Sequence, residues 1–443
     1  MSHLDVMALD RELSRTAHAW ERWRAGLRQG RGLDEDPFEP LAVFAPPVGK
    51  TAFDAVAELT TGDPMRRPLQ RWMYRLAEQR INRAALAGTA WLRHGATHPL
   101  HEPRRGQYSI RQIVRQILTD PSRRGEWVRA LVETGRDLGA AEGLLWERRR
   151  EVAQRMGLAS PNDIESPSPT VPAVAERWLE GTESLAKEVW PPDLGAFITA
   201  ALGTEAVEGW PARLTPRTVA ELLRETGWLR RVSFDVPELP SPIAPASYVR
   251  ALDQVGWAWA RALTPHHQPF VIARDPYDLS TRALATRFAL LTLNRPFLVR
   301  SLGLGADRAR AHARTLARVV LLSVRIAALR VTLRRHALNG TQALQEAFPD
   351  AVRSALGFAL PPHLAAVVFR LEVDDLAQFA GILRGAAAVV EDVEEHDEDW
   401  FRNPRAQEAF RAAADRSPDT ESSEPELEAG MNALLRILTE AWE

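Results

Sequence analysis

The stretch Ser247-Tyr-Val-Arg-Ala-Leu-Asp-Gln-Val-Gly-Trp-Ala-Trp-Ala-Arg-Ala-Leu263 decides how this chain is expected to fold. An Ala-Leu pair precedes Asp253, and the triplet Ala-Trp-Ala directly follows Trp257. Small and apolar residues in this arrangement, with charged residues between them, are typical of an amphipathic helix. We therefore expect a helix to cross the middle of the chain here.

Helical periodicity also dominates the rest of the sequence. Apolar residues recur at three- and four-residue spacing, with Arg and Glu between them, in Ala17–Leu27, Leu69–Arg93, Ile110–Leu118, Arg123–Met156 and Arg308–Ala337. Gly and Pro separate these stretches, as at Gly157 and Pro161. The pattern predicts a mainly α fold.

A small β element is expected just before the central helix. In Arg231–Val236, Val232 and Phe234 alternate with polar residues, which is typical of a strand. Several prolines follow directly, so this strand is expected at an edge of any sheet. Gln268–Ala273 is a second candidate for a short extended segment.

The chain divides into three regions by its loops. The Pro- and Ser-rich segment Glu165–Pro172 separates an N-terminal helical region, 1–165, from a second helical region with short strands, 173–415. Residues 416–443 begin with an acidic loop and end in a short helix, Leu427–Trp442.

Composition limits the class of protein. The 443 residues carry a net charge of -2, so no general attraction to nucleic acid or anionic membrane is expected. Cys is absent, which excludes disulfides, Cys-ligated zinc and thiol catalysis. The N-terminus lacks a signal-peptide pattern, and the most apolar stretch, Val319–Val324, is too short to span a bilayer. We expect a cytoplasmic protein.

The central helix carries a pattern close to His-Glu-x-Gly-His, a zinc motif. That motif places two imidazoles on one helix face, with a Glu between them as general base. Here Asp253 and Trp257 stand at the ligand positions and Gln254 at the base position. Gln accepts no proton at neutral pH, and an indole offers a donor but no metal-binding lone pair. No metal, cofactor or catalysis is expected, whether these residues derive from a zinc site or form an ordinary helix with Trp packed in the core.

A second segment extends the comparison to a family. Leu145–Ser160 has Arg149, Glu151, Ala153 and Gly157 in the arrangement of a helix-end segment of the gluzincin peptidases, with Arg150 in place of an Asn. Together with Gly256, it resembles thimet oligopeptidase and oligoendopeptidase F. The resemblance implies a large multi-helix metallopeptidase-like body with a small β edge near the former active-site helix. It also implies a third zinc ligand, a Glu, near Asp275–Arg282, but no Glu occurs between Glu238 and Glu346.

Other candidate sites have weaker patterns. His266 and His267, with Asp275 and Asp278 nearby, are considered for a different metal site or an unrecognised hydrolase site, but adjacent side chains in a loop seldom converge on one ion. The acidic run Glu391–Asp399 lacks the Gly-punctuated spacing of a calcium loop and suits a solvated helix face.

The sequence therefore favours binding over catalysis. We expect an inactive peptidase-like protein that holds a peptide or a partner protein, within a larger assembly. Candidate contacts are Val232 and Phe234 for backbone pairing, and Trp257 and Trp259 as anchors. The alternative is a helical scaffold that docks through outer charged faces, for which the stripe Arg310, Arg314 and Arg318 is the candidate.

Overall fold

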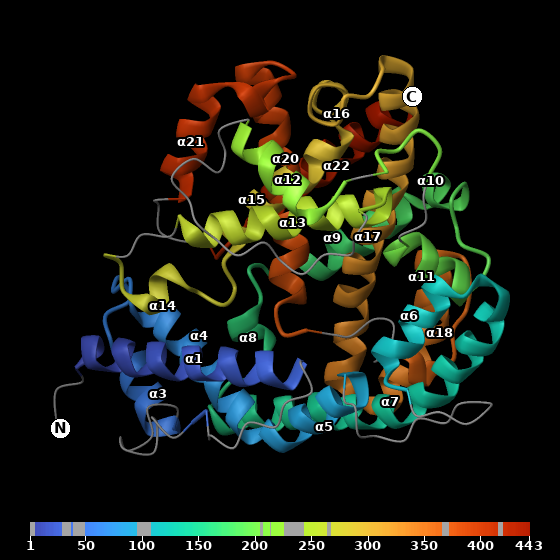
Figure 1. The fold of residues 1–443 in the computed structure, drawn as a ribbon. Helices are drawn as coiled ribbons and strands as arrows, with labels where there is room; N and C mark the ends of the chain where they lie inside the picture. Colours follow the sequence, from blue (N-terminus) through green and yellow to red (C-terminus); the bar gives the residue numbers. More distant parts are fainter. Residues whose placement is uncertain are drawn as a thin grey trace.

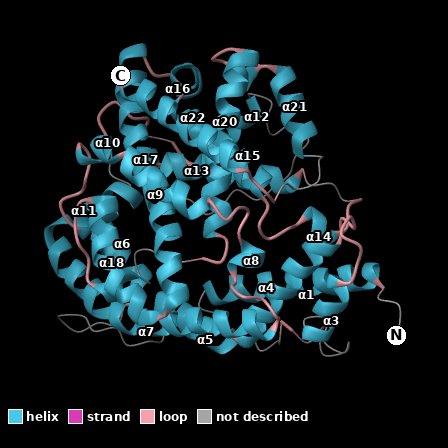
Figure 2. Ribbon diagram, turned by 180° about the vertical axis from the view of Figure 1, so that it is seen from behind, coloured by secondary structure: helices cyan, strands magenta, loops and turns pink. Residues whose placement is uncertain are grey.

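The structure, a computed structural model, is helical wherever it assigns regular secondary structure, and Figure 2 shows helices joined by loops. It describes residues 5–28, 37–38, 49–94, 108–203, 207–212, 214–225, 243–263, 267–365, 372–414 and 420–443. Within these ranges, no helix is long and apolar enough to cross a membrane.

The first part of the chain supplies the helices that precede the central stretch. They are α1 (Val6–Arg28), α3 (Lys50–Ala57), α4 (Arg66–Ile81), α5 (Arg83–His94), α6 (Ile110–Thr119), α7 (Arg124–Arg155), α8 (Asn162–Glu165), α9 (Val171–Gly181), α10 (Glu183–Lys187), α11 (Leu194–Leu202) and α12 (Pro216–Glu225). The expected periodic stretches are thus confirmed as helices. The stretch predicted over 69–93 is two helices, since α4 ends at Ile81 and α5 begins at Arg83. Asn82 lies between them as the C-cap of α4, and its side-chain amide donates to Glu78.

The second part begins with the predicted central helix, which is confirmed. Its helices are α13 (Pro245–Ala262), α14 (Phe270–Ala273), α15 (Leu279–Leu290), α16 (Arg295–Leu302), α17 (Ala306–Asn339), α18 (Thr341–Leu356), α20 (Asp375–His396), α21 (Pro404–Ala414) and α22 (Glu424–Trp442). Short 3-10 turns cover 121–123, 291–293, 362–364 and 400–402. The predicted C-terminal helix starts at Glu424 because Ser423 and Glu426 form a capping box.

The expected β edge is not found among the residues that the structure describes. The segment 231–236, with Val232 and Phe234, lies outside them. Gln268–Ala273 was expected to be extended, and that prediction is wrong, because Phe270–Ala273 forms the helical turn α14. The carboxylate of Asp10, on α1, accepts the backbone N–H groups of Phe270 and Val271 at 3.1 and 2.9 Å. A distant side chain therefore satisfies the donors at the start of this turn.

The helices form two levels joined along one side, as Figure 1 shows. Helices α1, α4, α5 and α7 make up one level, and α13, α15, α20 and α22 make up the other. The long helix α17 runs from the upper level to the lower one and contacts α7, α13, α20 and α22. The space between the levels is where α13 faces α1 and α4.

The upper level is held by close helix contacts in the order α13, α15, α20 and α22. A Cβ atom on Gly256 of α13 would lie 2.9 Å from the Cα atom of Ala285 on α15. A Cβ atom on Gly385 of α20 would lie 2.6 Å from the carbonyl oxygen of Ala283, also on α15. Both glycines therefore permit an approach that a side chain would prevent: Gly256 allows α13 to lie close to α15, and Gly385 allows α20 to do so.

Buried apolar residues form two clusters. The smaller cluster joins α1, α3 and α4 to the end of α7 and to Val271 of α14. The larger one extends from Ile110 to Ala441 and includes α13, α15, α17, α20 and α22. A fully buried ion pair between Arg71 of α4 and Asp275, with 3.2 Å between nitrogen and oxygen, links the lower level to the segment before α15. The predicted region boundaries near 165 and 416 stay predictions.

Candidate functional site: a charged central cleft

One face of α13 lines two neighbouring cavities. Arg250 and Asp253 line the first, and Trp257 and Arg261 line the second. Their spacing of three, four and four residues puts all four side chains on the same side of the helix. The positions at which the sequence was compared with zinc ligands, Asp253 and Trp257, thus face interior space rather than the core.

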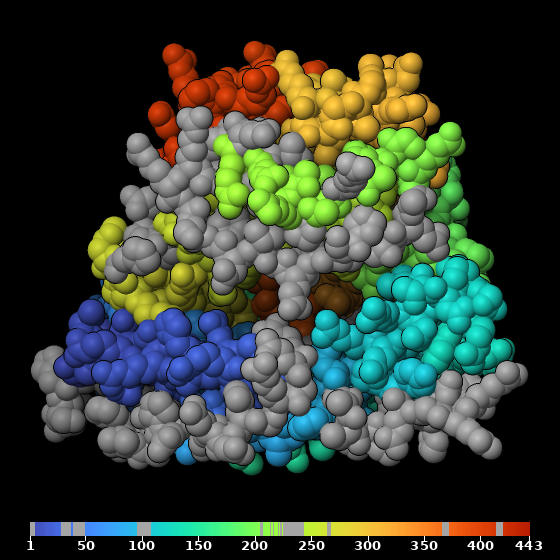
Figure 3. Space-filling model, viewed as in Figure 1, coloured from blue at the N-terminus to red at the C-terminus, as the bar shows by residue number. Residues whose placement is uncertain are grey.

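The two cavities meet at the start of α20. Asp374 and Gln378 line both, and the side-chain amide of Gln378 donates to the Asp374 carboxylate at 3.0 Å. We call the first, of about 500 Å³, the aliphatic cavity and the second, of about 350 Å³, the Trp/Arg cavity; together they are the central cleft. Figure 3 shows a hollow near the middle of one face, between the blue and cyan lower helices and the yellow and green upper ones.

The carboxylate of Asp253 is occupied by a neighbour. Arg282 of α15 donates to both of its oxygens, with 3.1 Å for one contact. The two side chains are 23% and 16% exposed, so the pair lies partly in the cleft wall. Gln254 is half-buried and lines neither cavity. Asp253 is therefore bound by a guanidinium, and the residue at the general-base position lies off the cleft face.

The Trp/Arg cavity is lined mainly by indole, guanidinium and carboxylate groups. Its larger side chains are Trp20, Glu21, Arg24, Trp72, Arg75, Trp257, Arg261, Arg274, Asp275, Asp278 and Asp374. They come from α1, α4, α13, the segment before α15 and the start of α20. Five separate parts of the chain thus bring aromatic and charged groups to one small space.

Most of the acidic groups around this cavity already have partners. Asp275 pairs with Arg71, and burial raises the pKa of Asp275 against the effect of that cation. Asp278 caps α15 by accepting the backbone N–H groups of Ser280 and Thr281 at 2.8 and 3.1 Å. These carboxylates therefore act in local structure, and they do not converge on a common point.

Some of the cationic groups lack such partners. Within the part of the chain that the structure describes, Arg274 makes no ion pair or side-chain hydrogen bond, and burial, followed by the nearby charge of Arg261, lowers its pKa. Nη1 of Arg75 is buried and has no hydrogen-bond partner within the described structure. Trp257 is half-buried and has the guanidinium of Arg261 5.3 Å from its ring centre. The cavity therefore has hydrogen-bond donors in excess of acceptors.

The aliphatic cavity has a different character. Most of its lining side chains are Ala, Val, Leu and Ile from α11, α13, α15, α17, α20 and α22. The Asp253–Arg282 pair and Arg250 are charged groups in its wall. Near the start of α20 the lining also includes Arg330, Glu372, Asp375 and the shared Asp374. It is a chamber with an aliphatic body and a charged end.

Asp375 is the most perturbed carboxyl group of this charged end. Its side chain is 3% exposed, and burial raises its pKa to about 7, against the opposing effect of Arg330. Arg330 lies 4.0 Å away, and the carboxyl group accepts the backbone N–H of Glu372 at 2.7 Å. At neutral pH this group is therefore shared between its protonated and ionised forms.

The other sequence candidates do not gather at one place. Trp259 is fully buried and packs against Phe288 with ring centres 5.5 Å apart, so it belongs to the core between α13 and α15. His266 lies outside the described residues, and His267 is exposed, whereas Asp275 is buried. Over the described ranges, no group of three or more His, Cys, Asp or Glu side chains is arranged to hold a metal ion.

The outer arginine stripe contacts the end of the chain. Arg314 donates to the backbone oxygen of Glu443, and the guanidinium of Arg318 lies 5.7 Å from the ring centre of Trp442. Arg310 is exposed on the same helix, α17. The acidic run Glu391–Asp399 contributes to a different contact, because its Asp392 pairs with Arg287 of α15 at 3.3 Å. Two of the three stripe residues thus hold α22 against α17.

Sequence reasoning missed several residues of the cleft. Arg250 stands three residues before Asp253, so helical spacing alone places it on the same face as Asp253 and Trp257. Arg75, Arg274 and Asp375 come from other elements, and nothing local in the sequence indicates that they share a cavity with α13.

Comparison with known proteins gives a likeness of fold and no family. No family model matches the chain, and no curated protein matches it. Among solved structures, it is similar to metallocarboxypeptidase 1 of Trypanosoma cruzi, with a TM-score of 0.44, 14% identity and 99% of each chain covered. A likeness of this extent concerns the helical architecture and gives no residue a role. The narrower resemblance to thimet oligopeptidase and oligoendopeptidase F stays a prediction.

Proposed function

We propose that this protein binds an extended segment of a peptide or partner protein in the Trp/Arg cavity and does not hydrolyse it. The observation that carries the proposal is the α13 face, which presents Trp257 and Arg261 to a cavity that also holds Arg274 and a buried Nη1 of Arg75 with no hydrogen-bond partner among the described residues. Trp and Arg supply most of the binding energy at protein interfaces, because both combine a large apolar surface with directed donors.

The charged side chains of the Trp/Arg cavity indicate which peptide side chains it would bind. No described carboxylate pairs with Arg274, and Nη1 of Arg75 has no acceptor among the described residues, whereas Asp275 and Asp278 are already bound. A buried or half-buried cation is stabilised by an acceptor that comes with the ligand. We therefore expect the bound segment to carry an acidic side chain next to an aromatic or aliphatic one.

The absence of hydrolysis is proposed from the residues on the same helix face. Trp257 cannot coordinate a metal through its indole, and the Asp253 carboxylate is bound by Arg282. Gln254 accepts no proton at neutral pH and does not face the cleft.

Fluorescence polarisation tests the binding. The probes are two pools of short fluorescein-labelled peptides: one pool contains Asp and Glu among aromatic and aliphatic residues, and the other replaces the acids with Asn and Gln. We expect saturable binding of the acidic pool only. Trp257→Ala should weaken it about 30-fold, as expected for a hot-spot tryptophan. Mass spectrometry of the recovered peptides should show no cleavage.

A tryptophan on an outer face provides the matched control. Trp442 packs against Arg318 away from the central cleft, so Trp442→Ala should leave peptide affinity unchanged. Equal binding of both pools, or a larger loss with Trp442→Ala than with Trp257→Ala, contradicts the proposal and supports docking through the outer face.

A further inference from the structure

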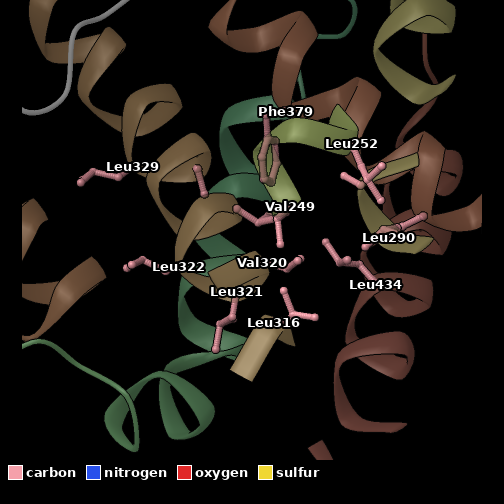
Figure 4. Packing of buried hydrophobic residues seen from close by; sticks show 14 of the residues in the cluster. Val249, Leu252, Leu290, Leu316, Val320, Leu321, Leu322, Leu329, Phe379 and Leu434 are labelled. Carbon is pink, nitrogen blue, oxygen red and sulfur yellow. The ribbon is translucent and has the colours of Figure 1, made fainter. Parts of the chain in front are cut away.

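The aliphatic cavity is large enough for a small molecule and is built differently from the Trp/Arg cavity. Its volume of about 500 Å³ lies within the range of ligand pockets. Figure 4 shows Val249, Leu290, Val320 and Leu434 pointing toward one another from α13, α15, α17 and α22. Each of these four residues also contributes to the lining of the cavity.

Arg250 is an isolated cation in this aliphatic wall. Among the residues that the structure describes, it makes no ion pair or hydrogen bond, and burial lowers its pKa. No carboxylate contributes to its electrostatic surroundings to an extent that offsets this burial. Arg250 is half-buried and lines the cavity, and its nitrogen atoms are not among the fully buried unpartnered atoms. A half-buried guanidinium without an anion is unfavourable, and an anionic ligand would remove that cost.

The other two cations that line the cavity have carboxylates beside them. Arg282 is bound to Asp253, and Arg330 lies 4.0 Å from Asp375, which is itself largely desolvated. Asp374 accepts a hydrogen bond from the side-chain amide of Gln378 and lines both cavities. Arg250 is therefore the group that a ligand in the aliphatic part would meet as an unsatisfied charge.

We infer that the aliphatic cavity binds a small carboxylic acid with an aliphatic body, whose carboxylate pairs with Arg250. This site goes beyond the proposed peptide binding and does not depend on it, since Arg250 lines only the aliphatic cavity. One guanidinium matches one carboxylate in a two-hydrogen-bond geometry. A dianionic phosphate would place a second negative charge in a cavity whose other end already carries Asp374 and Glu372.

Isothermal titration of the full chain with decanoate tests this site, with decanol as the neutral analogue of the same length. We expect decanoate to bind with a stoichiometry of one and more tightly than decanol. Arg250→Gln should weaken decanoate binding about ten- to hundredfold, the range for losing a charge-assisted hydrogen bond, and should leave decanol unaffected. Arg250→Lys keeps the charge but loses the planar guanidinium, so its affinity for decanoate should lie between those of the native chain and Arg250→Gln.

Arg310→Gln is the matched control, because Arg310 is an exposed arginine on the outside of α17. It should bind decanoate as the native chain does. Circular dichroism melting of each variant establishes that it is folded before it is titrated. Equal affinities for decanoate and decanol, or an Arg250→Gln variant that binds decanoate as tightly as the native chain, overturns the inference. Trp257→Ala should leave decanoate binding intact, which separates failure of this site from failure of peptide binding.

Discussion

Arg282 of α15 donates from both terminal nitrogens to the two carboxylate oxygens of Asp253 on α13. The pair joins the two helices at the wall of the central cleft and neutralises the carboxylate nearest to Arg250 along α13. It also explains why Asp253 is not an open acidic group, although it lies on the cleft face.

Removing the cation of this pair is expected to destabilise the fold. Arg282→Ala leaves a partly buried carboxylate without its donors, so we expect the free energy of unfolding to fall by about 1–3 kcal/mol. Urea denaturation measures the change. The control is Arg353→Ala, because Arg353 and Asp350 are 59% and 81% exposed and form a pair worth at most about 0.5 kcal/mol. Equal losses in the two variants would contradict a structural role for Arg282.

Close packing at Gly256 gives a second prediction. Gly256→Ala adds a methyl group 2.9 Å from the Cα atom of Ala285, and we expect a loss of about 1–3 kcal/mol despite the better helix propensity of alanine. At Gly88, inside α5, an added Cβ meets no atom within 4 Å. Gly88→Ala should therefore stabilise the protein by up to about 1 kcal/mol. Thermal melting measures the change in stability of both variants. Stabilisation by Gly256→Ala would contradict the close contact between α13 and α15.

Asp375 predicts a particular pH dependence. Burial raises its folded-state pKa to about 7 from the ordinary value of 3.8, so the folded protein binds a proton over a pH range in which the unfolded chain has released it. The contribution of this group is therefore most favourable below about pH 4 and is lost as the pH rises toward 7.

Asp375→Asn tests this dependence, because an amide stays neutral and its oxygen still accepts the N–H of Glu372. We expect the variant to gain about 1–3 kcal/mol over the native chain at pH 8 and less at pH 5. Chemical denaturation at both pH values gives the comparison. A gain that is the same at both pH values would show that Asp375 does not titrate in this range.

The metal content of the protein gives a fourth prediction. We expect the native chain to purify without stoichiometric zinc, since Asp253 is bound to Arg282 and Trp257 has no metal-binding lone pair. The triple variant Asp253→His, Gln254→Glu and Trp257→His should still bind zinc weakly, because it supplies two imidazoles and no third ligand. Elemental analysis measures both. Stoichiometric zinc in the native chain, or peptide hydrolysis that a Trp257 substitution abolishes, would disprove the proposed inactivity.

The helical fold was predictable because its signal is local. Apolar spacing indicated α13, α7 and α17, and Ser423 with Glu426 gives the start of α22 by capping. The segment from Phe270 to Ala273 was mispredicted because the carboxylate that caps it, Asp10, lies far away in the sequence. Its β-branched and aromatic residues favour a strand only when such a partner is ignored.

The cleft was predictable only in part. Helical spacing places Asp253 and Trp257 on one face, and both line the central cleft. Trp259 stands two residues from Trp257, so the same spacing places it on another side of the helix. Its burial against Phe288 depends on how α15 packs. The unpartnered state of Arg250 is likewise a property of the assembled cavity, since it depends on which carboxylates come near.

Amide hydrogen exchange of the full chain, with and without a peptide selected from the acidic pool, tests the central claim most directly. We predict added protection in α13 (Pro245–Ala262), in the segment 274–281 and at the start of α20, which together surround the Trp/Arg cavity. Helices α17 near Arg310 and α22 should be unchanged. Protection confined to the outer part of α17 and to α22 would contradict the account, since it would place the partner on the outer face and leave the cleft unused.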